Sequence, residues 1–436
     1  MVNYRACTTI LVVVITIFYF DTAWSESGRT EDSHAFIGAR VIDGTGADPI
    51  ENATIIIRNG RFEAVGPSET IEVPDGATII KVPGKTIVPG LVNAHGHISD
   101  VKGLESKPEH YTTDHLLEQL RLYARYGVTT VFSLGGDKEK AFKLRDAQNT
   151  PDLDRARIFV AGPVVTSRDP KAARMMTHAI ADMKADYVKI RVDDNLGTVQ
   201  KMPPLTYKAV IDAAHQRGLK VASHVFYLED AKTLLKSGSD FIAHSIRDND
   251  IDKETIELLK TREVCVCPTL TRELSTFVYE NRPAFFNDPF FLREADPVVI
   301  EELLDPARQR EVRESKSAQG YKSALKVAIR NLKTLSTAGV RIAFGTDTGP
   351  AGRFQGYFEH IELEMMSEAG LTPMQIIKAA TSDAARCWEK HEELGSIQPG
   401  KWADLIILSK NPLDDIKNMR EIESVWISGN RIPQTR

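Results

Sequence analysis

The centre of the chain repeats one local pattern, in which a helix ends at a glycine and a short apolar strand follows. The glycines in question are Gly127, Gly218, Gly238 and Gly339, which follow helices predicted over 116–126, 205–217, 229–237 and 321–338. A glycine just past a helix supplies the left-handed conformation that ends it. Near-continuous apolar strands between helices are typical of a parallel sheet that helices cover.

The number of these strands predicts how the sheet closes. Strands are predicted at 128–134, 157–165, 186–192, 219–223, 240–243, 264–270 and 340–345, and one more ends at His97. Eight strands joined by helices predict an α/β fold, a (β/α)8 TIM-like barrel, over residues 86–394.

Both ends of the chain are rich in short strands and turns instead. Residues 34–85 contain two strand patterns and Asn59-Gly60, a hairpin signal, and residues 395–436 carry a similar pair of strands. We expect the two segments to pair into one small β-sandwich domain made from both termini.

The first residues have the features of a signal peptide, over residues 1–25. Arg5 is followed by an apolar run over 6–20, and Ala23-Trp24-Ser25 fits a small-x-small cleavage site. The run is shorter than the roughly 20 residues that span a bilayer, so no stable membrane span is expected after cleavage. We expect an exported protein, periplasmic or secreted; the alternative is an uncleaved N-terminal anchor.

Charge and cysteine content argue against a nucleic-acid-binding protein and against a disulfide-rich scaffold. The net charge of −5 gives no basic surface for nucleic acid, so no nucleic-acid partner is expected. Cys7 lies in the signal peptide, and the remaining Cys265, Cys267 and Cys387 do not make a disulfide framework. We expect these three to pack in the core.

One segment, residues 271–319, interrupts the barrel pattern. It is long for a loop and contains aromatic residues, among them Phe277, Tyr279 and Phe285. We expect an ordered lid over the catalytic face.

Polar side chains stand at the ends of the predicted barrel strands. In such barrels the carboxyl ends of the strands form the active site, so these side chains should converge. His95 and His97 are two residues apart and therefore share one face of their strand, where they can bind one metal ion. The other members of the set are Lys189, His224, His244 and Asp347.

Each of these residues also has an ordinary structural explanation. His224 and His244 could be hydrogen-bonded core histidines, and Asp347 could cap the next helix. Lys189 could pair with Asp193 or Asp194 outside the site, although a lysine inside a barrel is costly to desolvate. The occurrence of all six at suitable strand ends favours a metal site.

Three motifs resemble those of the amidohydrolase superfamily, in its imidazolonepropionase-like and Xaa-Pro dipeptidase-like branch. They are IVPGLVNAHGH at 87–97, GTDTG at 345–349 and LGSIQPGKWADL at 394–405. The resemblance implies a binuclear centre with two divalent metal ions, for which we expect zinc. By the same resemblance, His95, His97 and Asp347 hold the buried ion, and His224 and His244 the exposed one. Lys189, as a carbamate, bridges both.

The resemblance also implies the reaction. A hydroxide that bridges the metals attacks the amide or peptide bond of a dipeptide or N-acyl amino acid, and Asp347 moves its proton to the leaving nitrogen. His178 and Tyr227 are candidate substrate-binding residues, and Arg272 and Arg353 are further candidates for binding a carboxylate. Gly96 between the histidines and the residues after His224 depart from the family pattern, which leaves substrate specificity open.

Two alternatives remain. The same binuclear centre could hydrolyse a lactone or a phosphoester, and from a different class the chain could be a catalytically silent scaffold. A deaminase is less well supported, since deaminases of this superfamily generally use one metal and no bridging lysine. We expect a small-molecule substrate and a homo-oligomer.

Overall fold

The structure, a computed structural model, describes residues 1–2 and 33–434. The predicted signal peptide lies outside these ranges except for its first two residues. Among the described residues, no helix has the length and apolar character needed to cross a membrane.

A ring of parallel strands forms the centre of the molecule, and a bridge between Val165 and Ile190 joins its two sheets. Its strands are β6 (Leu91–Gly96), β9 (Val128–Ser133), β10 (Arg157–Val160), β11 (Val188–Arg191), β12 (Val221–His224), β13 (Phe241–Ala243) and β14 (Cys265–Cys267). The eighth position is taken by the extended segment around Ile342, which bridges to Val266. A hydrogen bond of 2.8 Å from Ala94 N to Phe344 O joins this segment to β6 and closes the ring. The predicted barrel is therefore confirmed.

Helices connect the strands and cover their outer face. They are α1 (Thr113–Arg125), α2 (Glu139–Asp146), α3 (Pro170–Asp182), α4 (Pro204–Gln216), α5 (Leu228–Ser237), α6 (Lys253–Thr261) and α11 (Lys316–Thr337). After the eighth strand come α12 (Tyr357–Glu368), α13 (Pro373–Lys378) and α14 (Ala384–Cys387). Local sequence sets their ends: Asp252 and Ser315 accept hydrogen bonds from the first turns of α6 and α11. The four predicted glycines all have positive φ.

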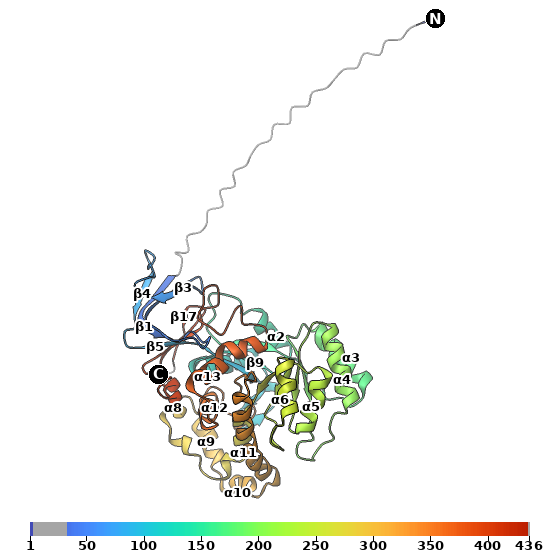
Figure 1. The fold of residues 1–436 in the computed structure, drawn as a ribbon. Helices are drawn as coiled ribbons and strands as arrows, with labels where there is room; N and C mark the ends of the chain where they lie inside the picture. The colour runs from blue at the N-terminus through green and yellow to red at the C-terminus, as the bar shows by residue number, and fades with distance from the viewer. Residues whose placement is uncertain (3–32, 435–436) are drawn as a thin grey trace. The chain divides into compact units, whose positions relative to one another are not determined.

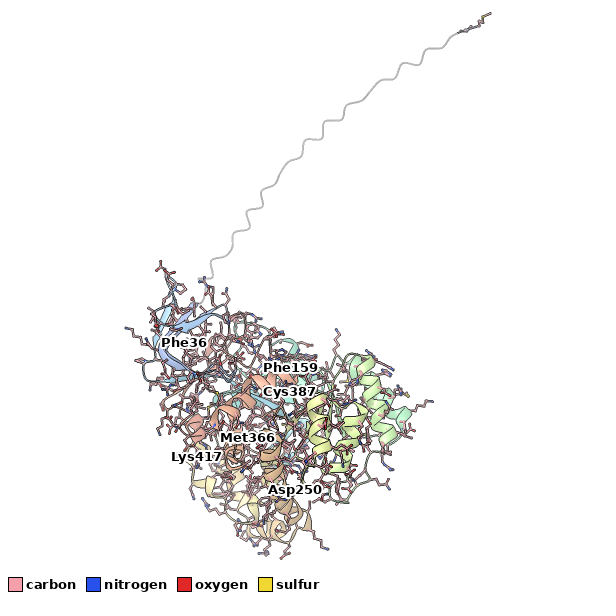
Figure 2. All side chains as sticks on the ribbon, in the orientation of Figure 1. Phe36, Phe159, Asp250, Met366, Cys387 and Lys417 are labelled. Atoms are coloured by element: carbon pink, nitrogen blue, oxygen red, sulfur yellow. A yellow bond between two sulfur atoms is a disulfide. The ribbon has the colours of Figure 1, made fainter. Side chains whose placement is uncertain are left out.

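The barrel interior is filled from below by Trp388, which follows α14. Its ring packs against Phe132, Tyr187 and Phe241, and its Nε1–H donates to Ala94 O at 3.2 Å. Figure 2 labels Phe159 and Cys387, two further members of this interior cluster. Side chains from strands and from the last helices thus form one continuous core.

The cysteines require a correction. We expected Cys265, Cys267 and Cys387 to pack without a disulfide, but Cys265 and Cys387 are bonded, with a sequence separation of 122 residues. Three cysteines are too few for a framework of several disulfides, but they are enough for one. The barrel fold brings β14 and α14 together at its base, so that Cys265 and Cys387 can bond. Cys267 remains a buried free thiol.

The apolar stretch 86–97 is two strands in two different sheets. β5 (Thr86–Pro89) pairs with the N-terminal β1 (Ser33–Val41) and the C-terminal β15 (Leu405–Leu408), whereas β6 enters the barrel. Gly90 lies between them, and a Cβ there would lie 2.1 Å from Thr129 Oγ1. The chain can therefore pass from one sheet to the other only with glycine at this position.

The two termini pair into one β-rich unit, as predicted. Its eight strands lie in the order β17-β16-β15-β5-β1-β2-β3, and β4 pairs with β1. The blue N-terminal strands and β17 lie together in Figure 1. The remaining strands are β2 (Ile50–Arg58), β3 (Arg61–Pro67), β4 (Thr78–Lys81), β16 (Ile422–Ile427) and β17 (Asn430–Arg431). A short hairpin, β7 (Val101–Lys102) and β8 (Glu105–Ser106), follows the first barrel strand.

The insertion is ordered, as predicted. It consists of α7 (Leu270–Ser275), α8 (Pro289–Leu292), α9 (Pro297–Leu303), α10 (Pro306–Glu314) and two short 3-10 turns. Its aromatic rings pack into a satellite core with Tyr126, Tyr357 and Phe358 of the neighbouring helices. The rings thus anchor the segment to the flank of the barrel.

Candidate metal centre

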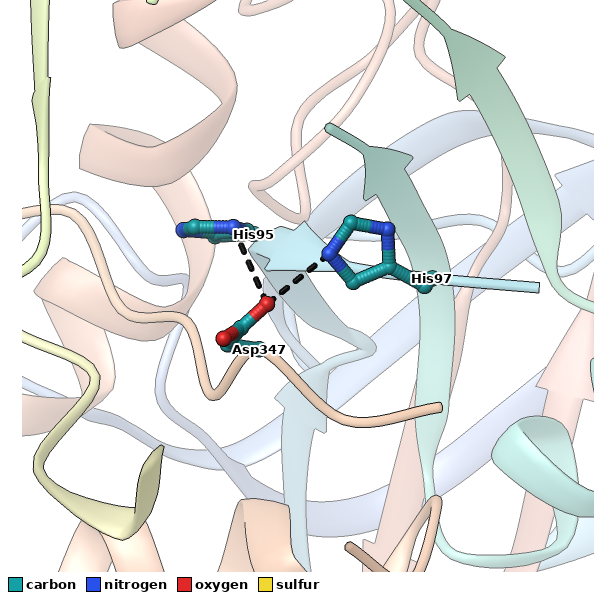
Figure 3. A group of neighbouring side chains, drawn as sticks. All are labelled: His95, His97 and Asp347. Atoms are coloured by element: carbon teal, nitrogen blue, oxygen red, sulfur yellow. Dashed lines mark hydrogen bonds and ion pairs between the residues drawn. The ribbon is translucent and has the colours of Figure 1, made fainter. Parts of the chain in front are cut away.

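Three of the predicted residues meet where the first and eighth strands end (Figure 3). Asp347 Oδ1 lies 2.8 Å from His97 Nε2 and 3.3 Å from His95 Nε2. One ligand atom from each residue falls within 4.8 Å of the other two. These are the donor atoms and the spacing that a divalent ion needs.

The hydrogen bonds of His97 test whether a metal fits. Its Nδ1 lies 3.1 Å from the carbonyl oxygen of Gly135, so Nδ1 carries the proton. A neutral ring then has its lone pair on Nε2, which faces the Asp347 carboxylate at 2.8 Å. A contact of 2.8 Å between these two atoms needs a proton or a metal ion between them, and the same pair of donor atoms can bind one divalent ion.

The other three predicted residues lie beside the first three. Lys189 Nζ is 3.4 Å from His95 Nε2. The ring of His244 is 4.7 Å from that of His95 and 4.1 Å from that of His224, centroid to centroid. The barrel therefore brings all six predicted ligands to one place.

Neighbours fix which nitrogen of the outer histidines is available. Asp193 accepts a hydrogen bond from His224 Nε2 at 3.0 Å, which leaves the lone pair on Nδ1. His244 uses Nδ1 for the hydroxyl of Thr269 at 2.7 Å, which leaves Nε2 toward the group. Each ring therefore keeps one nitrogen that these hydrogen bonds do not use.

Burial and charge keep the donors in the state that binds metal. Burial lowers the pKa of His224 to about 3 and that of His244 well below its usual value, so both rings are neutral. Burial acts to raise the pKa of Asp347, but Arg353 and His95 outweigh it and hold that pKa well below the usual range. Burial also lowers the pKa of Lys189 to about 8, so a fraction of the protein molecules carries a neutral amine at this position near pH 7.

The backbone holds the ligands rigidly. His244, Thr269 and Asp347 have φ values of 75°, 47° and 58°, a region that residues other than glycine seldom adopt and that is found mainly at functional sites. Asp347 N also donates to His95 O. At Gly345 a Cβ would lie 2.8 Å from His95 N, so the first and eighth strands approach this closely only with glycine there.

The two predicted substrate-binding residues, His178 and Tyr227, do not join the group of six predicted ligands. His178 lies in the middle of α3, in the outer layer of helices, and the structure does not bring it to the six residues. Tyr227 follows His224, but its hydroxyl donates to Asp194 at 2.7 Å and Lys201 lies over its ring. In the described residues, neither His178 nor Tyr227 has a hydrogen bond to any of the six predicted ligands.

The two arginine candidates do lie at the site. Arg353 Nη1 donates to Asp347 Oδ2 at 2.5 Å. Arg272 is 6% exposed, and its charge is close enough to contribute to the lowered pKa of His224, after burial. A cavity of about 450 Å³ is lined by His97, Ile98, Tyr111 and Pro350.

Several supporting residues were not predicted as part of the site. Asp193 and Thr269 orient His224 and His244, and Glu359 accepts hydrogen bonds from Asn93, Thr346 and Thr348 at 2.6–2.7 Å. Asn93 and Thr346 lie beside the ligands in sequence, which is the one signal that points to them. Glu359 has no such signal, because it comes from α12.

Comparisons with known proteins agree with this geometry. The sequence model of the Amidohydrolase family matches residues 86–432. The solved structure of a Xaa-Pro dipeptidase with methionine bound in the active site is similar, with a TM-score of 0.73 and 23% identity. It covers 92% of this chain and 99% of that one.

Curated relatives match a smaller part of this chain. Imidazolonepropionase from Geobacillus kaustophilus is 23% identical over 402 residues, which is 83% of this chain and 84% of that protein. Ochratoxinase from Aspergillus niger is 27% identical over 242 residues, or 54% of this chain. That match spans 42% of the ochratoxinase, less than half of its length.

Proposed function

The chain belongs to the amidohydrolase family and is a hydrolase, and from this premise we propose that it cleaves the amide bond of a dipeptide or N-acyl amino acid. The observation that carries the proposal is the convergence of four histidines, one aspartate and a buried lysine on one space. In this proposal His95, His97 and Asp347 hold one divalent ion and His224 and His244 a second.

Lys189 is the residue that argues for two ions over one. It is 4% exposed, and no carboxylate of the described residues lies within ion-pair distance of its amine. An amine offers one lone pair, but a carbamate formed with carbon dioxide has two oxygens, one for each ion. The low pKa of Lys189 supplies the neutral amine that this reaction needs.

The residues around the centre have separable roles in hydrolysis. Divalent ions, when bound, lower the pKa of water from 15.7 to about 7 and polarise a carbonyl oxygen. Asp347 is deprotonated, and we assign it to take the proton of the attacking water and to pass it to the leaving nitrogen. Arg353 holds Oδ2 of Asp347, and so fixes the direction of Oδ1.

Known proteins of this fold support the choice of substrate. The solved dipeptidase holds methionine, an amino acid, in its active site. Export, from the predicted signal peptide, and zinc as the metal remain parts of the proposal.

A substrate screen on zinc-loaded protein tests it. We expect dipeptides or N-acyl amino acids to have higher kcat/KM than lactones and phosphotriesters, and elemental analysis to give about two ions per chain. Asp347→Asn should fold and keep at least one ion but lose roughly 100-fold or more in kcat, because an amide cannot carry the proton.

The control is Asp75→Asn, which changes an exposed turn residue. Turnover confined to lactones or phosphotriesters would overturn the substrate assignment. One ion per chain, unchanged by added metal, would overturn the binuclear centre.

A further inference from the structure

A second cluster of buried charges lies beside the metal ligands and has no part in holding them. Arg247 follows His244, and Arg272 and Glu273 lie in α7 after the seventh strand. Glu273 Oε1 is 3.0 Å from Arg247 Nε and 3.1 Å from Arg272 Nη1. Two guanidinium groups thus share one carboxylate oxygen.

The charges of this cluster do not balance. Asp193 pairs with Arg191, and Asp347 pairs with Arg353. The third nearby carboxyl group, Glu362, accepts hydrogen bonds from Leu270 N and Thr271, and burial raises its pKa to about 8. Arg247 and Arg272 then face Glu273 alone, which leaves one positive charge in excess. A buried charge without a partner is costly, so the site is built to receive an anion.

Free hydrogen-bond donors show where the anion would bind. Arg247 Nη2 is buried and has no hydrogen-bond partner in the described residues. Arg272 has five N–H groups, and its hydrogen bonds to described residues use Nη1 for Glu273 and Nη2 for the hydroxyl of Tyr321. The remaining donors can bind a carboxylate in the bidentate geometry that guanidinium favours.

Packing fixes the orientation of Arg272. Its guanidinium lies 4.1 Å from the centre of the Tyr321 ring, and the Tyr321 hydroxyl donates to Asn195 at 3.0 Å. Tyr321 belongs to α11 and Asn195 to the loop after β11, so two barrel connections hold the arginine beside His224. Tyr227, in contrast, already donates its hydroxyl to Asp194.

We propose that Arg272 is the specificity-determining residue for a free carboxylate on the substrate, with Tyr321 and Glu273 as positioning residues. The inference rests on the proposed amide hydrolysis, and it names the part of the substrate that this site reads. The substrate class is then an N-acyl amino acid or dipeptide with an unblocked carboxyl end, in preference to a neutral amide.

The test compares each acid with its own carboxamide. Acetate release from N-acetyl-L-methionine, N-acetyl-L-phenylalanine and N-acetyl-L-proline is measured on zinc-loaded protein, beside the three carboxamides. Wild type should favour the acid by roughly 100-fold in kcat/KM, because the carboxamide leaves the buried charge unpaired. Arg272→Gln should remove most of this preference by raising the KM of the acid. The kcat/KM of the carboxamide should change little.

Further variants separate recognition from folding. Tyr321→Phe keeps the stacked ring and removes one acceptor, so the preference should fall by roughly 3- to 10-fold. Arg272→Lys keeps the charge without the planar fork and should lie between wild type and Arg272→Gln. Arg330→Gln, an exposed position on the same helix as Tyr321, is the control and should change nothing.

Binding is measured separately, so that failure of catalysis does not decide the question. Calorimetric titration should show the acids binding wild type more tightly than the carboxamides, and Arg272→Gln binding both alike. Protein that binds acids in this way but hydrolyses no amide would refute the proposed function alone. Equal binding of acid and carboxamide by wild type, no binding of either, or an unchanged preference in Arg272→Gln or Tyr321→Phe would overturn the role of Arg272.

Discussion

At the scale of single residues, environment decides which of several roles a side chain has. Lys189 could have paired with Asp193 or Asp194, but Asp193 binds His224 and Arg191, and Asp194 binds Tyr227. The amine instead lies 3.4 Å from His95. No ion pair in the described residues explains this buried lysine, and its place beside His95 supports the proposed bridging role.

Lys189→Ala tests the bridge. We expect loss of activity and of the second ion, and partial recovery of both with added acetate, because a free carboxylate can replace the two oxygens of a carbamate. Metal content and kcat at increasing acetate measure this. Lys208→Ala, on the exposed face of α4, controls for loss of a lysine elsewhere. A mild loss of activity without rescue by acetate would contradict the bridge.

At the scale of elements, the insertion supports the loop that follows Asp347. The Tyr279 hydroxyl donates to Gly352 O at 2.5 Å, and Arg353 Nε donates to Ser275 Oγ at 3.0 Å. The aromatic rings, Tyr279 among them, hold the segment against α12. The predicted lid would thus act through its first residues, Ser275 and Tyr279, and the aromatic residues that follow them would serve as an anchor.

Phe286→Ala tests this arrangement. Phe286 is 2% exposed and stacks on Phe291 at 5.6 Å. Its truncation should lower the free energy of unfolding by about 3–5 kcal/mol and raise KM more than it changes metal content. Leu292→Ala, at a 46% exposed position in the same segment, should change neither. Lost stability with unaltered kinetics on every substrate would show that the segment is an anchor only.

At the scale of the whole molecule, one covalent bond and one side chain close the base of the barrel. The Cys265–Cys387 disulfide ties β14 to α14, and Trp388 next to it fills the interior. Disulfides form in oxidising compartments, so this bond supports the proposal that the protein is exported.

Cys387→Ser tests the contribution of the bond. Bridging a loop of about 100 residues stabilises a protein by about 4.7 kcal/mol in the chain-entropy model, and measured values are about 2–5 kcal/mol. We expect a Tm lower by several degrees, measured by calorimetry, with metal content unchanged. Adding reductant to Cys387→Ser should cause no further shift. An equal Tm in wild type and variant would remove the disulfide from the sources of stability.

The sequence by itself determined the order of elements and the six residues at the candidate centre. Helix and strand periodicity, terminating glycines and the spacing of His95 and His97 are local signals, and strand ends in a barrel meet on one face. Only the tertiary structure decided which residues touch. Asp193 on His224, Glu273 between Arg247 and Arg272, and Cys265 with Cys387 depend on how separate strands and helices pack. The same packing divided residues 86–97 between two sheets and left His178 in the outer layer, since contacts between elements distant in sequence leave no local pattern.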